Sequence, residues 1–291
     1  MPLSLIPAPW RCTELDQIIP VRKVEERLNP DLSAQEYRLM LTERECSLEG
    51  GSDAAILLGR ATLEQIRLQC PDAFPVVFIE DKPSVEWRSF HIDSARHFWS
   101  LDELKKMIRT AWLFKFNRFH WHFSDDQGWR IESKRFPKLH ELGSVRKGDH
   151  FGQDFSEAEE GAYYTRDEVK ELVAYCAELG IEVVPEIDFP GHTSSILHAY
   201  PEFSCDGEPV EVKTSQGIFY DVICAGNDDA VRFCCDLLDD MLELFPGEYF
   251  HLGGDEAPKT HWKNCPRCQA RMKELGLSDL RELQGDFQNR L

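Results

Sequence analysis

From Trp87 onward, short apolar segments alternate with stretches of helical period, and this alternation restricts the possible folds more than any other feature of the chain. Strands are predicted over residues 89–94, 118–124, 181–188 and 248–252. Helices are predicted between them, and two begin with a capping box, Ser100 with Glu103 and Thr165 with Glu168. Repeated βα units of this kind imply parallel strands joined by right-handed crossovers.

Residues 1–84 differ from the rest of the chain and are predicted to form a small α+β domain. Strand-like alternation covers 36–42, and Asp53 can cap a helix that follows. The polar segment 80–83 ends in proline and suits a linker. We therefore expect two domains, 1–84 and 85–291, of which the second carries the βα units.

Polar side chains gather where each strand of the βα region is predicted to end. They lie at 93–96, 122–127, 188–192 and 255–256. In a (β/α)8 barrel the carboxyl ends of the strands face one common mouth, where active sites lie. The second domain is therefore predicted to be α/β, a TIM barrel, with its site at these strand ends.

The segment from Phe250 to Glu256 joins an apolar run to two glycines and two carboxylates. Gly253 and Gly254 allow the backbone to bend, so that Asp255 and Glu256 can face one pocket. Two carboxyl groups in one pocket cannot both ionise freely, so one pKa is expected to rise, as an acid–base catalyst requires. The alternative is a helix N-terminus with an acidic first turn.

The stretch from His120 to Asp125 places two histidines on one strand face. Such a pair with a carboxylate is typical of metal-dependent hydrolases. It can also be a hydrogen-bond relay in which Asp125 orients a histidine, or a packed strand. Among the tryptophans, Trp99, Trp129 and Trp262 could stack on sugars, although this residue type is more often part of a core.

The formal net charge of −19 argues against nucleic acid and anionic membranes as partners. The N-terminus has no basic and apolar pattern of a secretory signal, so a cytoplasmic location is expected. The ten cysteines are interpreted mainly as buried thiols in a reducing compartment. Cys265 and Cys268 form a lone C-x-x-C, which argues against zinc, whereas Cys205 and Cys224 could form a disulfide under oxidising conditions.

Taken together, the motifs from about Asp93 to the end of the chain resemble glycoside hydrolase family 20, the β-N-acetylhexosaminidases. The motifs that carry the resemblance are Asp93–His97, His120–Gln127, Glu186–His192 and His251–Glu256. The segment before residue 84 resembles a shortened form of the small domain that precedes the barrel in that family.

The resemblance implies a retaining exo-hydrolase that removes terminal N-acetylhexosamine from glycans without a metal or organic cofactor. The substrate's own 2-acetamido oxygen is the nucleophile in this family, which departs from the two-carboxylate scheme. Glu256 would be the general acid and then the base, and Asp255 would hold the acetamido group. By resemblance the substrate-binding or relay residues are Arg96, Asp125, Asp188, His192 and Trp262.

The chain is short for this fold, because a complete barrel takes about 250 residues. We therefore expect a barrel truncated after about four βα units, with weak activity unless two chains associate and complete one another. A metal-dependent hydrolase using His120 and His122 and a non-catalytic sugar-binding remnant are the alternative functions. The residues do not distinguish N-acetylglucosamine from N-acetylgalactosamine.

Overall fold

The computed structural model describes residues 3–151, 154–156 and 160–291. These residues form two compact units, which are described separately below. The first unit contains the chain up to Phe90 together with Asp102–Arg118 and Tyr175–Glu182, and the second contains His91–Leu101, Phe119–Ala174 and Val183–Leu291. The predicted domain boundary near residue 84 stays a prediction.

A five-stranded sheet and one long helix make up the amino-terminal part of the first unit. The sheet has the order β1-β5-β3-β4-β2, and every pairing is antiparallel except that of β2 with β4. The elements are β1 (Arg11–Pro20), β2 (Glu25–Leu28), β3 (Tyr37–Leu41), β4 (Cys46–Gly50), α1 (Asp53–Gln69) and β5 (Ala73–Asp81). The strand predicted over 36–42 is therefore confirmed.

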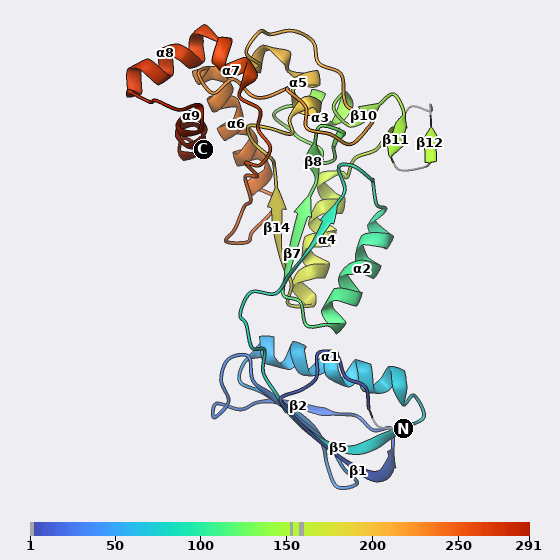
Figure 1. The fold of residues 1–291 in the computed structure, drawn as a ribbon. Coiled ribbons are helices and arrows are strands. Elements are labelled where there is room, and N and C mark those ends of the chain that lie inside the picture. Colours follow the sequence, from blue (N-terminus) through green and yellow to red (C-terminus); the bar gives the residue numbers. More distant parts are fainter. Residues whose placement is uncertain (1–2, 152–153, 157–159) are drawn as a thin grey trace. The chain divides into compact units, whose positions relative to one another are not determined.

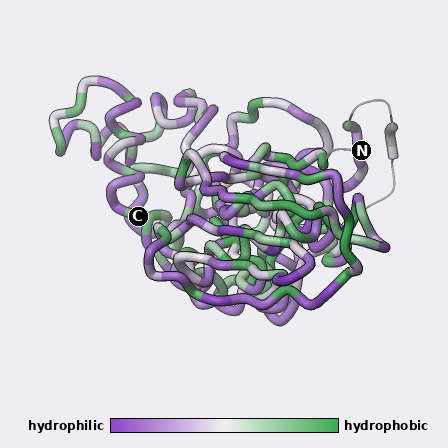
Figure 2. The backbone as a smooth tube through the Cα atoms, turned by 90° about the horizontal axis from the view of Figure 1, so that it is seen from below, coloured by the Kyte–Doolittle hydropathy of each residue, from purple (hydrophilic) through white to green (hydrophobic). Residues whose placement is uncertain are grey.

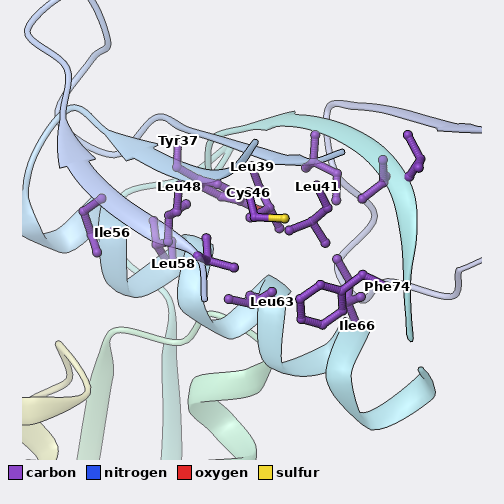
Figure 3. Packing of buried hydrophobic residues seen from close by; sticks show 14 of the residues in the cluster. Tyr37, Leu39, Leu41, Cys46, Leu48, Ile56, Leu58, Leu63, Ile66 and Phe74 are labelled. Carbon is purple, nitrogen blue, oxygen red and sulfur yellow. The ribbon is translucent and has the colours of Figure 1, made fainter. Parts of the chain in front are cut away.

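The core of this part lies between α1 and one face of the sheet (Figure 3). Tyr37, Leu39 and Leu41 alternate along β3 toward the helix, as a half-buried strand requires. The residue that caps α1 is Ser52 rather than the predicted Asp53, because the Ser52 side chain accepts the Ala55 N–H. Asp53 lies in the first turn, where its negative charge interacts favourably with the positive end of the helix dipole.

A three-stranded sheet with the order β14-β7-β6 carries the predicted strand–helix alternation. The arrows of β7 and β14 point the same way (Figure 1). The elements in chain order are β6 (Ser89–Asp93), α2 (Leu101–Leu113), β7 (Arg118–His122), α4 (Arg166–Glu178) and β14 (Glu182–Glu186). The predicted capping box of α4 is present, because Thr165 and Glu168 exchange side-chain to backbone hydrogen bonds.

The side chains of β7 alternate between two environments, as predicted. Phe119 and Trp121 are fully buried on one face, and His120 and His122 lie on the other. The ring of Trp121 lies 5.0 Å from that of Tyr164, and its N–H donates to Ser94. This aromatic core fixes which way the two histidines point.

The segment 248–252 does not form the buried strand predicted for it. His251 makes a single parallel bridge to Glu186, with its N–H donating to Pro185 and its carbonyl accepting from Ile187. Its side chain and that of Tyr249 are about half exposed, at 48% and 47%. One further hydrogen bond, from the Phe189 N–H to the Leu252 carbonyl at 3.0 Å, follows this bridge. Within the described residues no strand pairs with the other side of the segment.

The rest of the second unit consists of short strands and helices around the carboxyl ends of β7 and β14. They are β8 (Ser124–Asp125), β9 (Gly128–Trp129), α3 (Lys138–Glu141), β10 (Val145–Arg146), β11 (Asp149–Phe151), β12 (Asp154–Ser156), β13 (Glu160–Gly161), α5 (Ser194–Ala199), η1 (Pro201–Phe203), α6 (Asp228–Leu242), α7 (Thr260–Asn264), α8 (Pro266–Leu275) and α9 (Leu280–Asn289). Hydrophilic and hydrophobic residues are interleaved along the chain (Figure 2). None of the helices in the described ranges combines the length and apolar character needed to cross a membrane.

Candidate active site

Asp125 lies at the centre of a buried network of charged groups. It follows β7 in the tight hairpin of β8 and β9, and its side chain is only 1% exposed. His122 Nε2 donates to its carboxylate at 2.7 Å, and His192 Nδ1 does so at 3.1 Å. The Arg96 guanidinium pairs with the same carboxylate at 2.6 Å. Three cationic side chains from three separate segments therefore converge on one anion.

These contacts shift the pKa values of Asp125, His192 and His122. Burial alone would raise the pKa of Asp125, but the two histidines and Arg96 lower it to about 2. Burial also opposes the charged form of His192, yet hydrogen bonds to Asp125 and Asp126 raise its pKa to about 11. Bonds to Asp125 and Glu186 overcome burial in the same way and raise the pKa of His122 to about 10. Both histidines are therefore imidazolium ions at neutral pH.

His192 connects this network to the two carboxylates that follow the glycines. Its Nδ1 is held by Asp125 and by Asp126, at 3.1 and 3.2 Å. Its Nε2 is buried and has no hydrogen-bond partner among the described residues. This atom lies 3.5 Å from Glu256 Oε2 and 3.9 Å from Asp255 Oδ2. The predicted relay residues are thus brought together with the predicted catalytic pair.

The backbone around the predicted catalytic pair, Asp255 and Glu256, takes conformations that few residues adopt. Gly253 and Gly254 have φ angles of +61° and +116°, and a Cβ at Gly253 would lie 1.9 Å from Asp188 Oδ1. Glu256 and His192 also have positive φ, at 43° and 53°, which is uncommon for residues with a side chain. No helix begins at Asp255 or Glu256, so the alternative of an N-terminal cap is wrong.

Asp188 supplies a protonated carboxyl group beside the pair. It is 2% exposed, and its Oδ1 accepts the Gly254 N–H at 2.8 Å. Burial, together with the charge and hydrogen bond of Asp255, raises the pKa of Asp188 to about 8. The carboxyl group that holds a proton at neutral pH is therefore Asp188, and its position next to Gly253 explains why that residue has no side chain.

Glu186 was not selected from the sequence, and it is the second charged centre of the site. Its carboxylate lies 2.7 Å from His120 Nε2, 2.7 Å from His122 Nδ1 and 3.0 Å from His251 Nδ1. Despite burial, these three histidines lower its pKa far below the usual range. In the sequence Glu186 lies within the strand predicted over 181–188 and opens the family motif Glu186–His192, but neither gave it a role of its own.

The same contacts count against the metal-hydrolase alternative for His120 and His122. Both ring nitrogens of His122 lie 2.7 Å from carboxylate oxygens, those of Glu186 and Asp125. A metal ligand must be a neutral imidazole with a free lone pair. His122 is therefore a hydrogen-bond donor that joins Glu186 to Asp125.

The predicted tryptophans differ in their surroundings. Trp129 and Trp262 are fully buried, and the Trp262 N–H donates to the carbonyl of Ile223 at 2.9 Å. Neither ring presents a face to solvent, so the sugar-stacking interpretation does not fit these two residues. Trp99 is half-buried, and its N–H donates to the carbonyl of Asp93.

Arg96 lies at the edge of the network and remains 31% exposed. It pairs with Asp93 at 3.0 Å and donates to Gln127 at 2.9 Å. The guanidinium is therefore held in place by Asp93, Asp125 and Gln127. A substrate that reached the exposed part of this group would meet an oriented donor.

Four cysteines meet elsewhere in this unit, against the expectation drawn from the lone C-x-x-C. Cys265 and Cys268 lie beside Cys205 and Cys224, with all four Sγ atoms within 4.8 Å of one another. Spacing in the sequence did not reveal this cluster, because two of its members come from separate loops. All four thiols are free.

Comparisons with known proteins agree with the motifs. A family model described as the glycosyl hydrolase family 20 catalytic domain matches residues 85–291. A beta-hexosaminidase of Porphyromonas gingivalis is 41% identical over 266 residues, which is 88% of this chain and 33% of that protein. The first curated relatives are covered over 33%, 57% and 43% of their length, so the chain spans about half of them or less.

Solved structures show the same relationship. A beta-N-acetylhexosaminidase from Bacteroides fragilis matches with a TM-score of 0.85 and 31% identity, covering 97% of this chain and 62% of that chain. An exo beta-N-acetylglucosaminidase from Vibrio harveyi in complex with N-acetylglucosamine matches with a TM-score of 0.83 and 27% identity, covering 99% and 53%. With its α/β fold, its motifs and the match over residues 85–291, this chain belongs to glycosyl hydrolase family 20.

Proposed function

We propose that the chain carries the acid–base machinery of a retaining exo-β-N-acetylhexosaminidase that uses substrate-assisted catalysis. The observation that supports this most is the buried Nε2 of His192, which has no hydrogen-bond partner in the described part of the chain and lies 3.5 Å from Glu256 and 3.9 Å from Asp255. The names of the relatives, beta-hexosaminidase and beta-N-acetylhexosaminidase, point to the same reaction. The substrate class is a glycan that ends in an N-acetylhexosamine.

Glu256 is the proposed general acid and base. Its side chain is 49% exposed, so it can reach the oxygen of a leaving group. As its proton departs, the negative charge develops 3.5 Å from the imidazolium of His192, which stabilises it. Because Asp125 and Asp126 hold the other side of that ring, the cation needs no rearrangement during the reaction.

Asp255 is the proposed partner of the substrate's acetamido group. The neighbouring Asp188 keeps its own proton at neutral pH, since its pKa is raised to about 8. The Asp255 side chain is 69% exposed, so it can accept the N–H of the acetamido group and stabilise the positive charge that forms as the acetamido oxygen attacks the sugar carbon. The exposed part of Arg96 is suited to the hydroxyl groups of the terminal sugar.

We also propose that β6, β7 and β14 are the first strands of a (β/α)8 barrel. The common direction of β7 and β14 and the parallel bridge between Glu186 and His251 support this (Figure 1). If separate chains complete one another, light scattering of the 291-residue chain will show an oligomer, and specific activity will rise with concentration. A monomer with concentration-independent activity would contradict self-association.

The decisive experiment compares leaving groups. The chain is assayed with aryl N-acetyl-β-glucosaminides that carry an activated or an unactivated phenol. Glu256→Gln removes the acid, so it should slow the unactivated substrate by about 10²–10⁴-fold and the activated one much less. Asp255→Asn should slow both substrates, because the acetamido oxygen bonds to the sugar carbon as the phenol leaves, whichever phenol that is.

The control is Glu274→Gln, whose side chain is 67% exposed in the same unit, and which should leave both rates unchanged. A Glu256→Gln enzyme that slows both substrates equally would contradict the acid assignment. An aryl β-glucoside without the acetamido group should not react, and its hydrolysis at a similar rate would contradict substrate assistance. Binding of N-acetylglucosamine without turnover of any substrate would favour the sugar-binding remnant.

A further inference from the structure

Four cysteines from three segments of the second unit converge on one point. Cys205 follows η1, and Cys224 lies in the loop before α6. Cys265 occupies the N-cap of α8, and Cys268 lies in its first turn. All four Sγ atoms lie within 4.8 Å of one another, and every member except the half-buried Cys205 is buried.

The spacing of these sulfur atoms fits a single tetrahedral ion. Cys224 Sγ lies 3.7 Å from the Sγ atoms of both Cys265 and Cys268. A zinc ion with Zn–S bonds of about 2.3 Å places its sulfur ligands about 3.8 Å apart. We propose that Cys205, Cys224, Cys265 and Cys268 bind one structural zinc ion.

The donor set indicates a structural site. Four thiolates complete a tetrahedral shell and leave no position for water or substrate, as in closed zinc sites. A disulfide would join only two of the four sulfurs, at about 2.05 Å, and would leave two thiols beside it. Cys224 is equally close to Cys265 and to Cys268, so the arrangement favours no single pair.

The backbone around the cluster holds the ligand segments together independently of an ion. The Arg267 guanidinium, between the two cysteines of the C-x-x-C, donates to the carbonyls of Ser204 and Cys205 at 2.9 and 3.1 Å. Gly226 lies against the backbone of α8, where a Cβ would come 2.3 Å from Cys268 N. The segments that carry the cysteines are therefore in close contact through their backbones, and the fold itself holds the four thiols near one another.

The zinc site also adjoins the proposed catalytic machinery. Ile223, next to Cys224, donates its N–H to the carbonyl of Pro190 at 3.0 Å and accepts the N–H of Trp262 at 2.9 Å. Pro190 lies in the loop that carries His192, and Trp262 lies in the helix that follows Glu256. The ion therefore adds to the protein hydrogen bonds that hold the segments near His192 and Glu256 against each other.

The first test measures the metal content of the 291-residue chain by inductively coupled plasma mass spectrometry. The chain is purified under reducing conditions without chelators. We expect roughly one zinc ion per chain. Cys268→Ser and the milder Cys205→Ser should each retain much less zinc after dialysis. The control is Cys176→Ser, which removes a buried thiol outside the cluster and should keep the full amount.

The second test replaces the metal in the unmodified chain, so it does not depend on folding of a variant. Removal of zinc with a chelator should lower the thermal midpoint, and zinc should restore it. Cobalt(II) should give the intense visible bands of a tetrahedral thiolate complex, and zinc should displace it. Metal-free protein that gains no cobalt bands, iron in place of zinc, or a mapped disulfide between Cys205 and Cys224 would overturn the proposal.

Discussion

Replacement of Asp125 by asparagine tests whether the buried charge network holds the site together. The carboxylate lies within 3.1 Å of His122 and His192 and within 2.6 Å of Arg96. An amide keeps the shape but removes the only charge that all three cations share. Removal of one partner from a buried ion pair typically costs about 3–5 kcal/mol, and we expect about 3 kcal/mol because the amide oxygen still accepts one hydrogen bond.

The pH dependence of the effect follows from the shifted pKa values. The pKa of His192 rises from 6.5 to about 11 on folding. Its contribution to the free energy of unfolding is therefore complete below pH 6.5 and is lost as the pH rises toward 11. The pKa of Asp125 falls from 3.8 to about 2, so its contribution is complete above pH 3.8 and is lost toward pH 2. The difference in the free energy of unfolding between the unmodified chain and Asp125→Asn should therefore be largest between pH 3.8 and 6.5.

The assay is urea unfolding followed by tryptophan fluorescence, because Trp121 and Trp129 are fully buried in the same unit. The control is Asp229→Asn, whose side chain is 74% exposed and pairs only at the surface with Arg232, and it should leave stability unchanged within error. The reasoning is refuted if Asp125→Asn behaves like this control. It is also refuted if the loss of stability is the same at pH 5 and at pH 9.

Three further substitutions test other parts of the site. Gly253→Ala should lower the thermal midpoint, because φ of +61° costs a side chain about 1–2 kcal/mol even before the clash with Asp188, whereas Gly285→Ala in the open part of α9 should not. In the unmodified chain Asp188 should lower the free energy of unfolding as the pH rises from 3.8 to 8, because folded Asp188 keeps a proton that the unfolded chain releases. Asp188→Asn should remove this part of the slope in pH-dependent urea unfolding and leave the fall above pH 6.5 that belongs to His192. Trp262→Phe leaves the Ile223 carbonyl unpaired and should cost about 1–3 kcal/mol in the same assay, with KM unchanged; a raised KM would instead indicate sugar stacking.

Several features of the fold could be predicted because they depend on neighbours in the chain. The capping box of Thr165 and Glu168 and the alternation of aromatic and histidine side chains along β7 involve residues at most three positions apart. The glycines at 253 and 254 likewise predicted a bend in the backbone, and the structure gives them positive φ angles. The family motifs contain Asp125, His192, Asp255 and Glu256, which the structure brings together, although the motifs did not show all the contacts of these residues.

Other features were missed because their partners are far apart in the chain. His120 and Glu186, which are 66 positions apart, are one such pair. Asp125 and His192 are separated by 67 positions, and only the family resemblance, not the order of residues, connected them as a relay. The segment 248–252 has the composition of a buried strand, but composition does not show whether a neighbour covers it. The same is true of Trp262, whose burial depends on the loop that carries Ile223.

The amino-acid order therefore determined the type and approximate position of each local element, since helix and strand periods and capping residues act over a few positions. Tertiary packing decided which side chains share a charge, which become buried and which cysteines meet. Cys205, Cys224 and the C-x-x-C at Cys265 show this most directly. No local rule relates these residues, and only the folding of three segments onto one another brings four sulfur atoms within 4.8 Å.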